Sequence, residues 1–277
     1  MELLPLVLVL LAGTLATGIE EIVLDMAPNS FDDQYLNCRP EMWKKLPVLH
    51  LSEVFSNSLY AQVWAEAAAK WPRPLGTLQR REEAIALLAY TMAQRDLYTQ
   101  FNSAVREGGR SLQHYLNNFD YKAMHFLLTE ALGDLRKNKS HPACLHVYRG
   151  IKNISFTAKP GQIIRFGQFA SSSREKSVSE DFGTDTFFNV YTCHGAMIQD
   201  FSAFPGQKEV LIPPFETFKV TDFKVTKDGT CIQLHSYSVH SKYSCAWLRG
   251  SSTHSEPPSL SGLLLAALAM AVATSTL

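Results

Sequence analysis

The sequence predicts an α+β fold, with a helical N-terminal half and a β-rich C-terminal half. Before residue 140, apolar residues recur at helical spacing. After it, they fall into short runs separated by turn residues such as Lys159-Pro160-Gly161 and Pro205-Gly206. Helices first and strands second are typical of α+β rather than alternating α/β folds. No GxGxxG or Walker A motif is present, so a Rossmann fold is not expected.

Four helices are predicted in the first half, and a shorter one interrupts the second half. The four are Ser52 to Trp71, Glu82 to Met92, Leu97 to Arg106 and Tyr121 to Leu135. Pro72, Pro74 and Gly76 separate the first from the second, and Gly108-Gly109 marks a later turn. The short amphipathic helix is Lys176 to Phe182.

Six strands are predicted in the second half, and turn residues separate most of them. They are Leu145 to Arg149, Ile163 to Phe166, Phe187 to Thr192, Glu209 to Ile212, Phe215 to Val225 and Cys231 to Tyr237. We see no internal repeat. One domain over residues 19–250 is therefore expected, mainly helical over 19–140 and mainly β over 141–250.

The N-terminus predicts a signal peptide over residues 1–18. Leu3 to Leu11 is a nearly continuous apolar run, too short to span a bilayer, and Ala16-Thr17-Gly18 fits a signal-peptidase site. The alternative is a buried N-terminal strand. A secretory route agrees with two N-glycosylation sequons, at Asn138 and Asn153.

The C-terminus has the order of a GPI-attachment signal. The small residues Gly250, Ser251 and Ser252 precede a polar spacer, and Leu263 to Ala273 is an apolar run close to the end. We expect attachment at Gly250 or Ser251, loss of the 251–277 propeptide, and a location on the outer face of the plasma membrane. The alternative is an amphipathic or disordered tail.

Charge and cysteine content exclude several function classes. The 26 Lys and Arg balance the 26 Asp and Glu, which argues against a nucleic-acid partner. The five cysteines form no CxxC pair and there is no HExxH, so no metal site is predicted. In a secreted chain they indicate disulfides and one leftover thiol. The five are Cys38, Cys144, Cys193, Cys231 and Cys245.

Three segments of the β-rich half carry the residues with the clearest chemistry. Val147 to Gly150, Phe166 to Ser173 and Phe204 to Pro214 place an arginine, a serine and a glutamate at strand ends. These are Arg149, Ser171 and Glu209. Together such groups can bind a phosphate ester and stabilise a cation beside it.

The order Arg, Ser, Glu resembles the R-S-E signature of the vertebrate mono-ADP-ribosyltransferases. Further similarity extends over Leu24 to Trp247 and both terminal signals. It includes Ser30 to Tyr35, Leu87 to Thr91, Ala104 to Glu107 and His125 to Glu130. The resemblance implies an NAD-binding β-sandwich core packed on helices, NAD as substrate with NADP as a further candidate, and no metal.

The resemblance also implies a role for each residue of the signature. Arg149 would hold the pyrophosphate, because a guanidinium offers two parallel donors. Ser171 would position the catalytic carboxylate and the nicotinamide ribose. Glu209 would stabilise the positive charge that develops on the ribose when the nicotinamide bond breaks. Further dinucleotide contacts would come from Tyr90, Gln168 and Ser202.

The cysteines fit the same resemblance. It implies the pairs Cys38–Cys245 and Cys144–Cys193. Cys231 is then left over, and we expect it to be a buried apolar residue rather than a reactive thiol.

One position departs from the family pattern. Arginine-transferring members carry Glu-x-Glu at the third segment, where this chain has Gln207, Lys208 and Glu209. Gln207 cannot act as a base, and Lys208 adds positive charge where a guanidinium acceptor would approach. We expect Gln207 to lie on the same strand and face as Glu209. Water is therefore the expected main acceptor.

Three hypotheses follow for the function. The first is an NAD glycohydrolase with weaker transfer to surface or secreted proteins. The second is an arginine transferase that tolerates Gln207. The third is a non-catalytic surface glycoprotein, which loss of Arg149 or Glu209 would have indicated.

Overall fold

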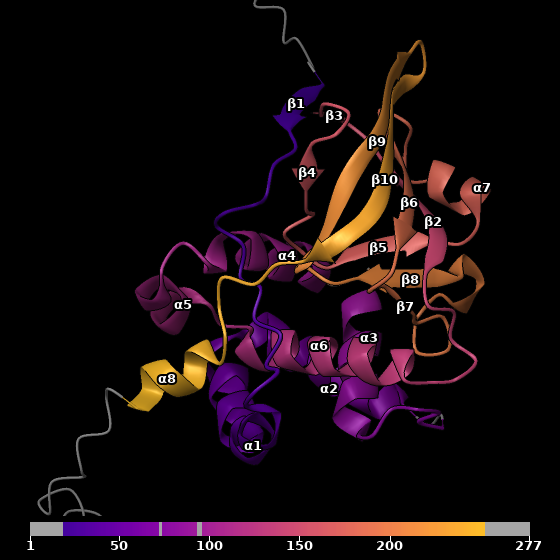
Figure 1. Cartoon of the computed structure of the whole chain (residues 1–277). Coiled ribbons are helices and arrows are strands. Elements are labelled where there is room, and N and C mark those ends of the chain that lie inside the picture. The colour runs from indigo at the N-terminus through magenta and orange to yellow at the C-terminus, as the bar shows by residue number, and fades with distance from the viewer. Residues whose placement is uncertain (1–18, 72–73, 93–95, 253–277) are drawn as a thin grey trace, which may run out of the picture.

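The computed structural model describes residues 19–252 apart from 72–73 and 93–95, and it separates helices from sheet (Figure 1). The helical half contains α1 (Arg39–Ser56), α2 (Ser58–Lys70), α3 (Arg81–Thr91), α4 (Leu97–Gly108), α5 (Leu112–Asn118) and α6 (Lys122–Arg136). The remaining helices are α7 (Lys176–Glu180), the 3-10 turn Pro205–Gln207 and α8 (Ala246–Ser252). The predicted division into helical and β-rich halves is confirmed.

Three helix starts are fixed by hydrogen bonds to side chains. Asn57 ends α1 and starts α2, because its side chain accepts a 3.0 Å hydrogen bond from the Tyr60 amide. Glu83 satisfies two amides at the start of α3, those of Gln79 and Arg80. The cap of α6 comes from another helix, since the Glu53 carboxylate of α1 accepts the first amides of α6, at 2.7 and 2.9 Å.

Most strands join one mixed sheet in the order β4-β9-β10-β6-β2-β5-β8-β7. Their bounds are β2 (Leu145–Ile151), β4 (Ile163–Ile164), β5 (Ala170–Ser173), β6 (Thr186–Thr192), β7 (Ala196–Met197), β8 (Glu209–Ile212), β9 (Glu216–Thr226) and β10 (Gly229–Val239). The pair β10–β6 is parallel and the other pairs are antiparallel. A separate parallel pair joins β1 (Glu20–Val23) to β3 (Ile154–Thr157).

The sheet changes direction at its β2–β5 junction. Only one residue pair, Tyr148 opposite Ser173, is in register there. In Figure 1, β5, β8 and β7 run across the strands from β9 to β2 and lie over the helices. Phe169 and Leu211 pack into the core of the helical half, whereas Val147 and Phe188 belong to a second core within the sheet. The functional residues gather where these two halves meet.

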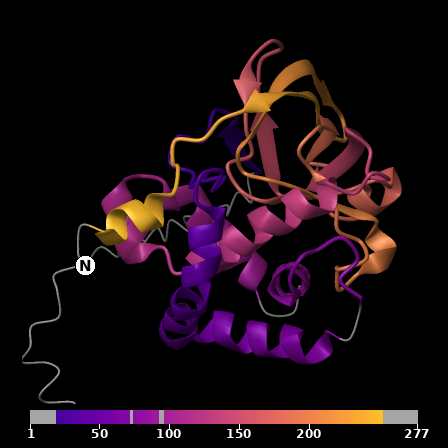
Figure 2. The same ribbon diagram turned by 60° about the horizontal axis from the view of Figure 1, so that its bottom comes forward.

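The segments near both termini of the described chain are tied together. Buried Asp32 accepts bonds from Arg165 at 2.6 Å and from the amides of Lys242 and Tyr243. Asp33 accepts the first amide of α8, that of Ala246, at 2.9 Å. Figure 2 shows α8 beside the N-terminal segments from a second direction.

The structure contains two disulfides, and they are the pairs that the resemblance implies. Cys38 is joined to Cys245, and Cys144 to Cys193. Cys231 on β10 is free and half-buried rather than fully buried.

Some predicted elements are corrected. The helix predicted over Ser52 to Trp71 is wrong, because Asn57 divides that stretch between α1 and α2. The predictions also missed most of α1, all of α5 and α8, and β1, β3, β5 and β7. The predicted signal peptide and most of the predicted propeptide lie outside the described residues, so both stay predictions. Within the described part of the chain, no helix has the length and apolar character needed to cross a membrane.

Candidate active site

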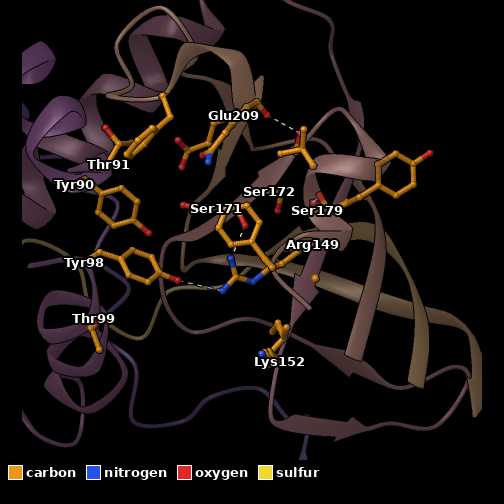
Figure 3. Close-up of a pocket in the computed structure, with 18 of the residues that line it drawn as sticks. Tyr90, Thr91, Tyr98, Thr99, Arg149, Lys152, Ser171, Ser172, Ser179 and Glu209 are labelled. Atoms are coloured by element: carbon orange, nitrogen blue, oxygen red, sulfur yellow. Dashed lines mark hydrogen bonds between the residues drawn. The ribbon is translucent and has the colours of Figure 1, made fainter. Parts of the chain in front are cut away.

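A cavity of about 500 Å³ opens between α3 and α4 on one side and β2, β5 and β8 on the other. Figure 3 shows that Arg149, Ser171 and Glu209 all face it, together with Tyr90 and Tyr98 from the helices. The three residues come from β2, β5 and β8, which are adjacent strands of the sheet. The structure therefore brings the predicted trio together.

Arg149 is held between the sheet and the helices. Its Nη1 donates to the carbonyl of Ser171, and its Nη2 donates to the Tyr98 hydroxyl at 3.3 Å. The side chain is half-buried and lines the cavity. A fixed guanidinium in this position can bind an anionic group such as a phosphate.

Glu209 is a buried carboxylate with two serine partners. Ser202 donates to its Oε2 at 3.1 Å, and the Ser171 hydroxyl also bonds it. Burial raises the pKa of Glu209, while the bonds from Ser171 and Ser202 and the charge of Arg149 oppose that rise. Burial thus favours the neutral form of the Glu209 carboxyl group, whereas the serine hydroxyls favour its charged form.

Tyr98 is a candidate site residue that the sequence analysis missed. It lies at the start of α4, and its ring meets that of Tyr90 edge-on with centroids 5.4 Å apart. The neighbouring charge of Arg149 lowers the pKa of Tyr98. A tyrosine on a helix gives no sequence signal of such a role, because only the fold brings it to Arg149.

The other predicted contacts are placed unequally. Tyr90 lines the cavity, and its hydroxyl donates to the Phe169 carbonyl and accepts a bond from Asn102. Ser202 and Gln168 are not among the lining residues. Ser202 lies buried behind Glu209, and Gln168 is bonded to Arg106.

The expectation that Gln207 shares a strand with Glu209 is wrong. Gln207 ends the 3-10 turn Pro205–Gln207, and Lys208 then takes a left-handed conformation (φ 45°) before β8 begins. Strand alternation therefore does not apply. Gln207 nevertheless lines the cavity with Glu209, held by a 2.6 Å bond from Ser173 to its carbonyl.

Lys208 does not direct its charge at the acceptor approach. It is exposed and forms an ion pair with Glu175, a residue outside the cavity lining. The electrostatic objection to a guanidinium acceptor thus rests on Gln207 alone.

The segment around α7, which forms the cavity rim on the sheet side, packs against Gly150, the residue after Arg149. A Cβ at position 150 would collide with the carbonyl oxygens of Ser179 and Gly183. This contact holds α7 and its flanking residue Phe182 against β2, and both contribute to the cavity lining. Among the lining residues, Ser172 is buried, and its Oγ has no hydrogen-bond partner among the described residues.

The remaining predicted sites lie away from the cavity. Asn138 and Asn153 are both exposed, as glycosylation requires, and their modification stays a prediction. Gly250 is buried in α8 against Leu116 of α5, so its backbone is less accessible than a run of small residues implies. Among residues 19–71, 74–92 and 96–252, no group of three or more His, Cys, Asp or Glu could hold a metal ion.

Comparisons with known proteins agree with this geometry. The family model described as NAD:arginine ADP-ribosyltransferase matches residues 24–242. The chain is 47% identical over 236 residues to an erythroblast NAD(P)(+)–arginine ADP-ribosyltransferase of Gallus gallus, which covers 83% of this chain and 78% of the relative. It is 43% identical over 258 residues to GPI-linked NAD(P)(+)–arginine ADP-ribosyltransferase 1 of Homo sapiens, covering 86% and 78%.

Solved structures give the same result. The crystal structure of the eukaryotic mono-ADP-ribosyltransferase ART2.2 superposes with a TM-score of 0.68 at 34% identity, covering 81% of this chain and 98% of that one. Mutants of that protein are known in complex with NADH and with NAD. By family model, relatives and fold alike, this chain belongs to the NAD:arginine ADP-ribosyltransferase family.

Proposed function

We propose that this chain is a cell-surface enzyme that cleaves the nicotinamide–ribose bond of NAD and passes ADP-ribose mainly to water. NADP is a further candidate substrate, since the relatives' names include both dinucleotides. The observation that carries the proposal is the convergence of Arg149, Ser171 and Glu209 on one cavity that also holds Gln207.

Each group of the trio has a defined chemical task. Arg149 binds the pyrophosphate, because its guanidinium faces the cavity and can offer donors to two phosphate oxygens. Glu209 accepts a hydrogen bond from the ribose 2′-hydroxyl and stabilises the positive charge on the ribose as the bond to nicotinamide breaks. Nicotinamide departs as a neutral molecule with the bonding electron pair. Water then adds to C1′ and loses a proton.

Ser171 and Ser202 act on Glu209 rather than on the reacting bond. Their hydroxyls bond the carboxylate and so fix its position. They also oppose the effect of burial, which raises the pKa of Glu209. Ser202 is therefore a positioning residue, and a direct dinucleotide contact is not needed to explain it.

The choice of acceptor depends on Gln207. A guanidinium acceptor must approach a ribose that is becoming positive, and a carboxylate at position 207 would offset that repulsion. Gln207 offers only a neutral carbonyl, whereas water needs no charged partner. Water is therefore the favoured acceptor at this site.

Transfer to protein arginine is the second candidate, and the names of the relatives favour it. Incubating the protein with labelled NAD, with and without agmatine, separates the two. We expect free ADP-ribose to dominate in both reactions. An agmatine adduct in excess of free ADP-ribose would establish the arginine transferase instead.

The location rests on the terminal sequences and the GPI-linked relatives. We propose a GPI lipid on the outer face of the plasma membrane, with surface or secreted proteins as minor ADP-ribose acceptors. A phosphatidylinositol-specific phospholipase should release the protein from expressing cells. Retention on the cells, with the tail still detected by an antibody, would require another anchor.

A further inference from the structure

Helix α1 carries apolar side chains on two faces. Met42, Leu46 and Leu49 face the core of the helical half. Val48, Leu51 and Phe55 face outward and are 74%, 56% and 83% exposed. Because they lie at positions i, i+3 and i+7, these three form one continuous row, which we call the α1 stripe. A helix that is apolar on two faces is typical of one that is covered on both.

The surroundings of the α1 stripe suit a lipid surface. Between residues 46 and 58 the ionisable side chains are His50, which is half-buried, and Glu53, which is buried and caps α6. Two exposed lysines, Lys44 and Lys45, precede the stripe, with Glu41 4.0 Å from Lys45. Exposed apolar side chains that can enter the headgroup boundary, with basic residues nearby, are features of helices that lie in the membrane interface.

The C-terminal end of the fold is held beside the start of α1. Cys38 directly precedes α1, Cys245 directly precedes α8, and a disulfide joins them. Both views place α1 and α8 at the end of the molecule away from the β9–β10 hairpin (Figures 1 and 2). Leu51 lies about 20 Å along the helix from Cys38. A lipid attached at Gly250 or Ser251, which lie within α8, therefore keeps the α1 stripe within reach of the bilayer.

We propose that the α1 stripe rests in the headgroup region of the outer leaflet and fixes the orientation of the anchored enzyme. This inference rests on the GPI anchor of the proposed function. The lipid anchor keeps the α1 stripe close to the bilayer, which raises its effective concentration there. Three apolar side chains can then hold the helix on the membrane, although they would bind only weakly without the anchor.

Side-chain footprinting with hydroxyl radicals tests the proposal on the anchored protein. The full-length processed protein is reconstituted into phosphatidylcholine vesicles, and labelling is compared before and after phospholipase release. We expect Leu51 and Phe55 to be labelled several-fold less while the protein is anchored. Val225, 74% exposed at the hairpin end, is the internal control and should not change.

The released protein gives a second measurement. We expect weak cosedimentation with phosphatidylcholine vesicles, and a triple variant Val48→Ser, Leu51→Ser, Phe55→Ser should partition roughly tenfold less or lower. The control Val225→Ser should behave as wild type. Cleavage of soluble NAD should be equal in all three, which shows that the variants are folded.

Three results would overturn the proposal. Equal labelling of Leu51 and Phe55 in both states would mean that the bilayer does not cover the stripe. Protection that persists after release and grows with protein concentration would mean that a second copy covers it. If the phospholipase releases nothing and cells secrete the chain, the proposed GPI anchor is wrong, but the α1 stripe can still be tested. The secreted protein is then mixed directly with the vesicles. If it does not cosediment with them, the proposal that the α1 stripe binds a membrane is wrong.

Discussion

Ser202 donates a 3.1 Å hydrogen bond to Oε2 of Glu209, although Ser202 is not part of the cavity lining. The serine is fully buried and also accepts a bond from the Phe204 amide. It thus connects the segment before β8 to the carboxylate that faces the cavity. Removing this hydroxyl should change the charge state of Glu209 without opening the cavity.

We predict that Ser202→Ala moves the acid limb of kcat/KM for NAD cleavage to higher pH. Burial already raises the pKa of Glu209, and the Ser202 bond opposes that rise. Activity needs the ionised carboxylate, so it is lost as pH falls through this pKa, and the variant loses it sooner. The check is a pH–rate profile of the two proteins. Ser238→Ala, on the exposed part of β10, is the control, and an unshifted limb in Ser202→Ala would contradict the assigned role.

Glu209→Gln should abolish both nicotinamide release and any transfer. The amide keeps the size of the side chain but cannot stabilise positive charge on the ribose, and the loss of one such stabiliser costs roughly 10² to 10³ in rate. Nicotinamide release is measured by chromatography. Glu180→Gln, exposed on α7, should retain wild-type turnover. Wild-type turnover in Glu209→Gln would show that Glu209 is not the catalytic carboxylate.

Tyr98→Phe should raise KM for NAD roughly three- to tenfold with a smaller effect on kcat, because it removes one hydrogen bond that holds Arg149. The remaining bond to the Ser171 carbonyl keeps the guanidinium in the cavity. Steady-state kinetics separate the two parameters. Tyr191→Phe on β6 is the matched control. A fall in kcat at unchanged KM would assign Tyr98 to the chemical step instead.

Gln207→Glu should raise the ratio of agmatine adduct to free ADP-ribose. A carboxylate at the cavity can form a charge-assisted pair with the acceptor guanidinium, roughly twice as strong as the neutral bond that Gln offers. Glycohydrolysis should change less. The ratio is compared between the two proteins at matched NAD. An unchanged ratio, with efficient transfer already in the wild type, would show that Gln207 does not select the acceptor.

Loss of the Cys38–Cys245 disulfide should lower the stability of the fold but leave NAD cleavage in place. Replacing Cys38 and Cys245 by serine opens a 207-residue loop, and chain entropy sets a ceiling of about 5 kcal/mol on the lost free energy of unfolding. The loss should appear as a lower denaturant midpoint, and α8 should become accessible to protease. NAD cleavage at 25 °C should persist, because neither cysteine lines the cavity. Unchanged protease resistance would contradict this account of how α8 is held.

The trio was identified by its resemblance to the R-S-E signature, and residue patterns alone placed only Arg149 and Glu209 at the ends of predicted strands. The α+β division came from the same patterns. Helix α1 was missed largely because Pro47 lies in its interior and normally marks a helix end. Tertiary packing of Met42, Leu46 and Leu49 overrides that local penalty.

Contacts between distant segments could not be predicted from residue patterns. Tyr98 and Arg149 are 51 positions apart, and Glu53 caps a helix that begins 69 residues later. The alternation argument for Gln207 failed because Lys208 adopts a left-handed conformation, which interrupts the strand period. This break depends on the backbone conformation of one residue. A lysine does not predict it, because Lys rarely adopts a left-handed conformation.

Gly150 has a consequence for ligands designed against this enzyme. With no room for a Cβ between β2 and α7, the distance from Arg149 to the Phe182 rim is set by backbone contact rather than by side chains that rotate. Moving α7 away from β2 would break this backbone contact, so the cavity cannot widen here by a shift of α7 without cost. On the opposite wall, Tyr98 and Thr99 present side chains to the cavity, so a bulkier ligand group is accommodated more readily there.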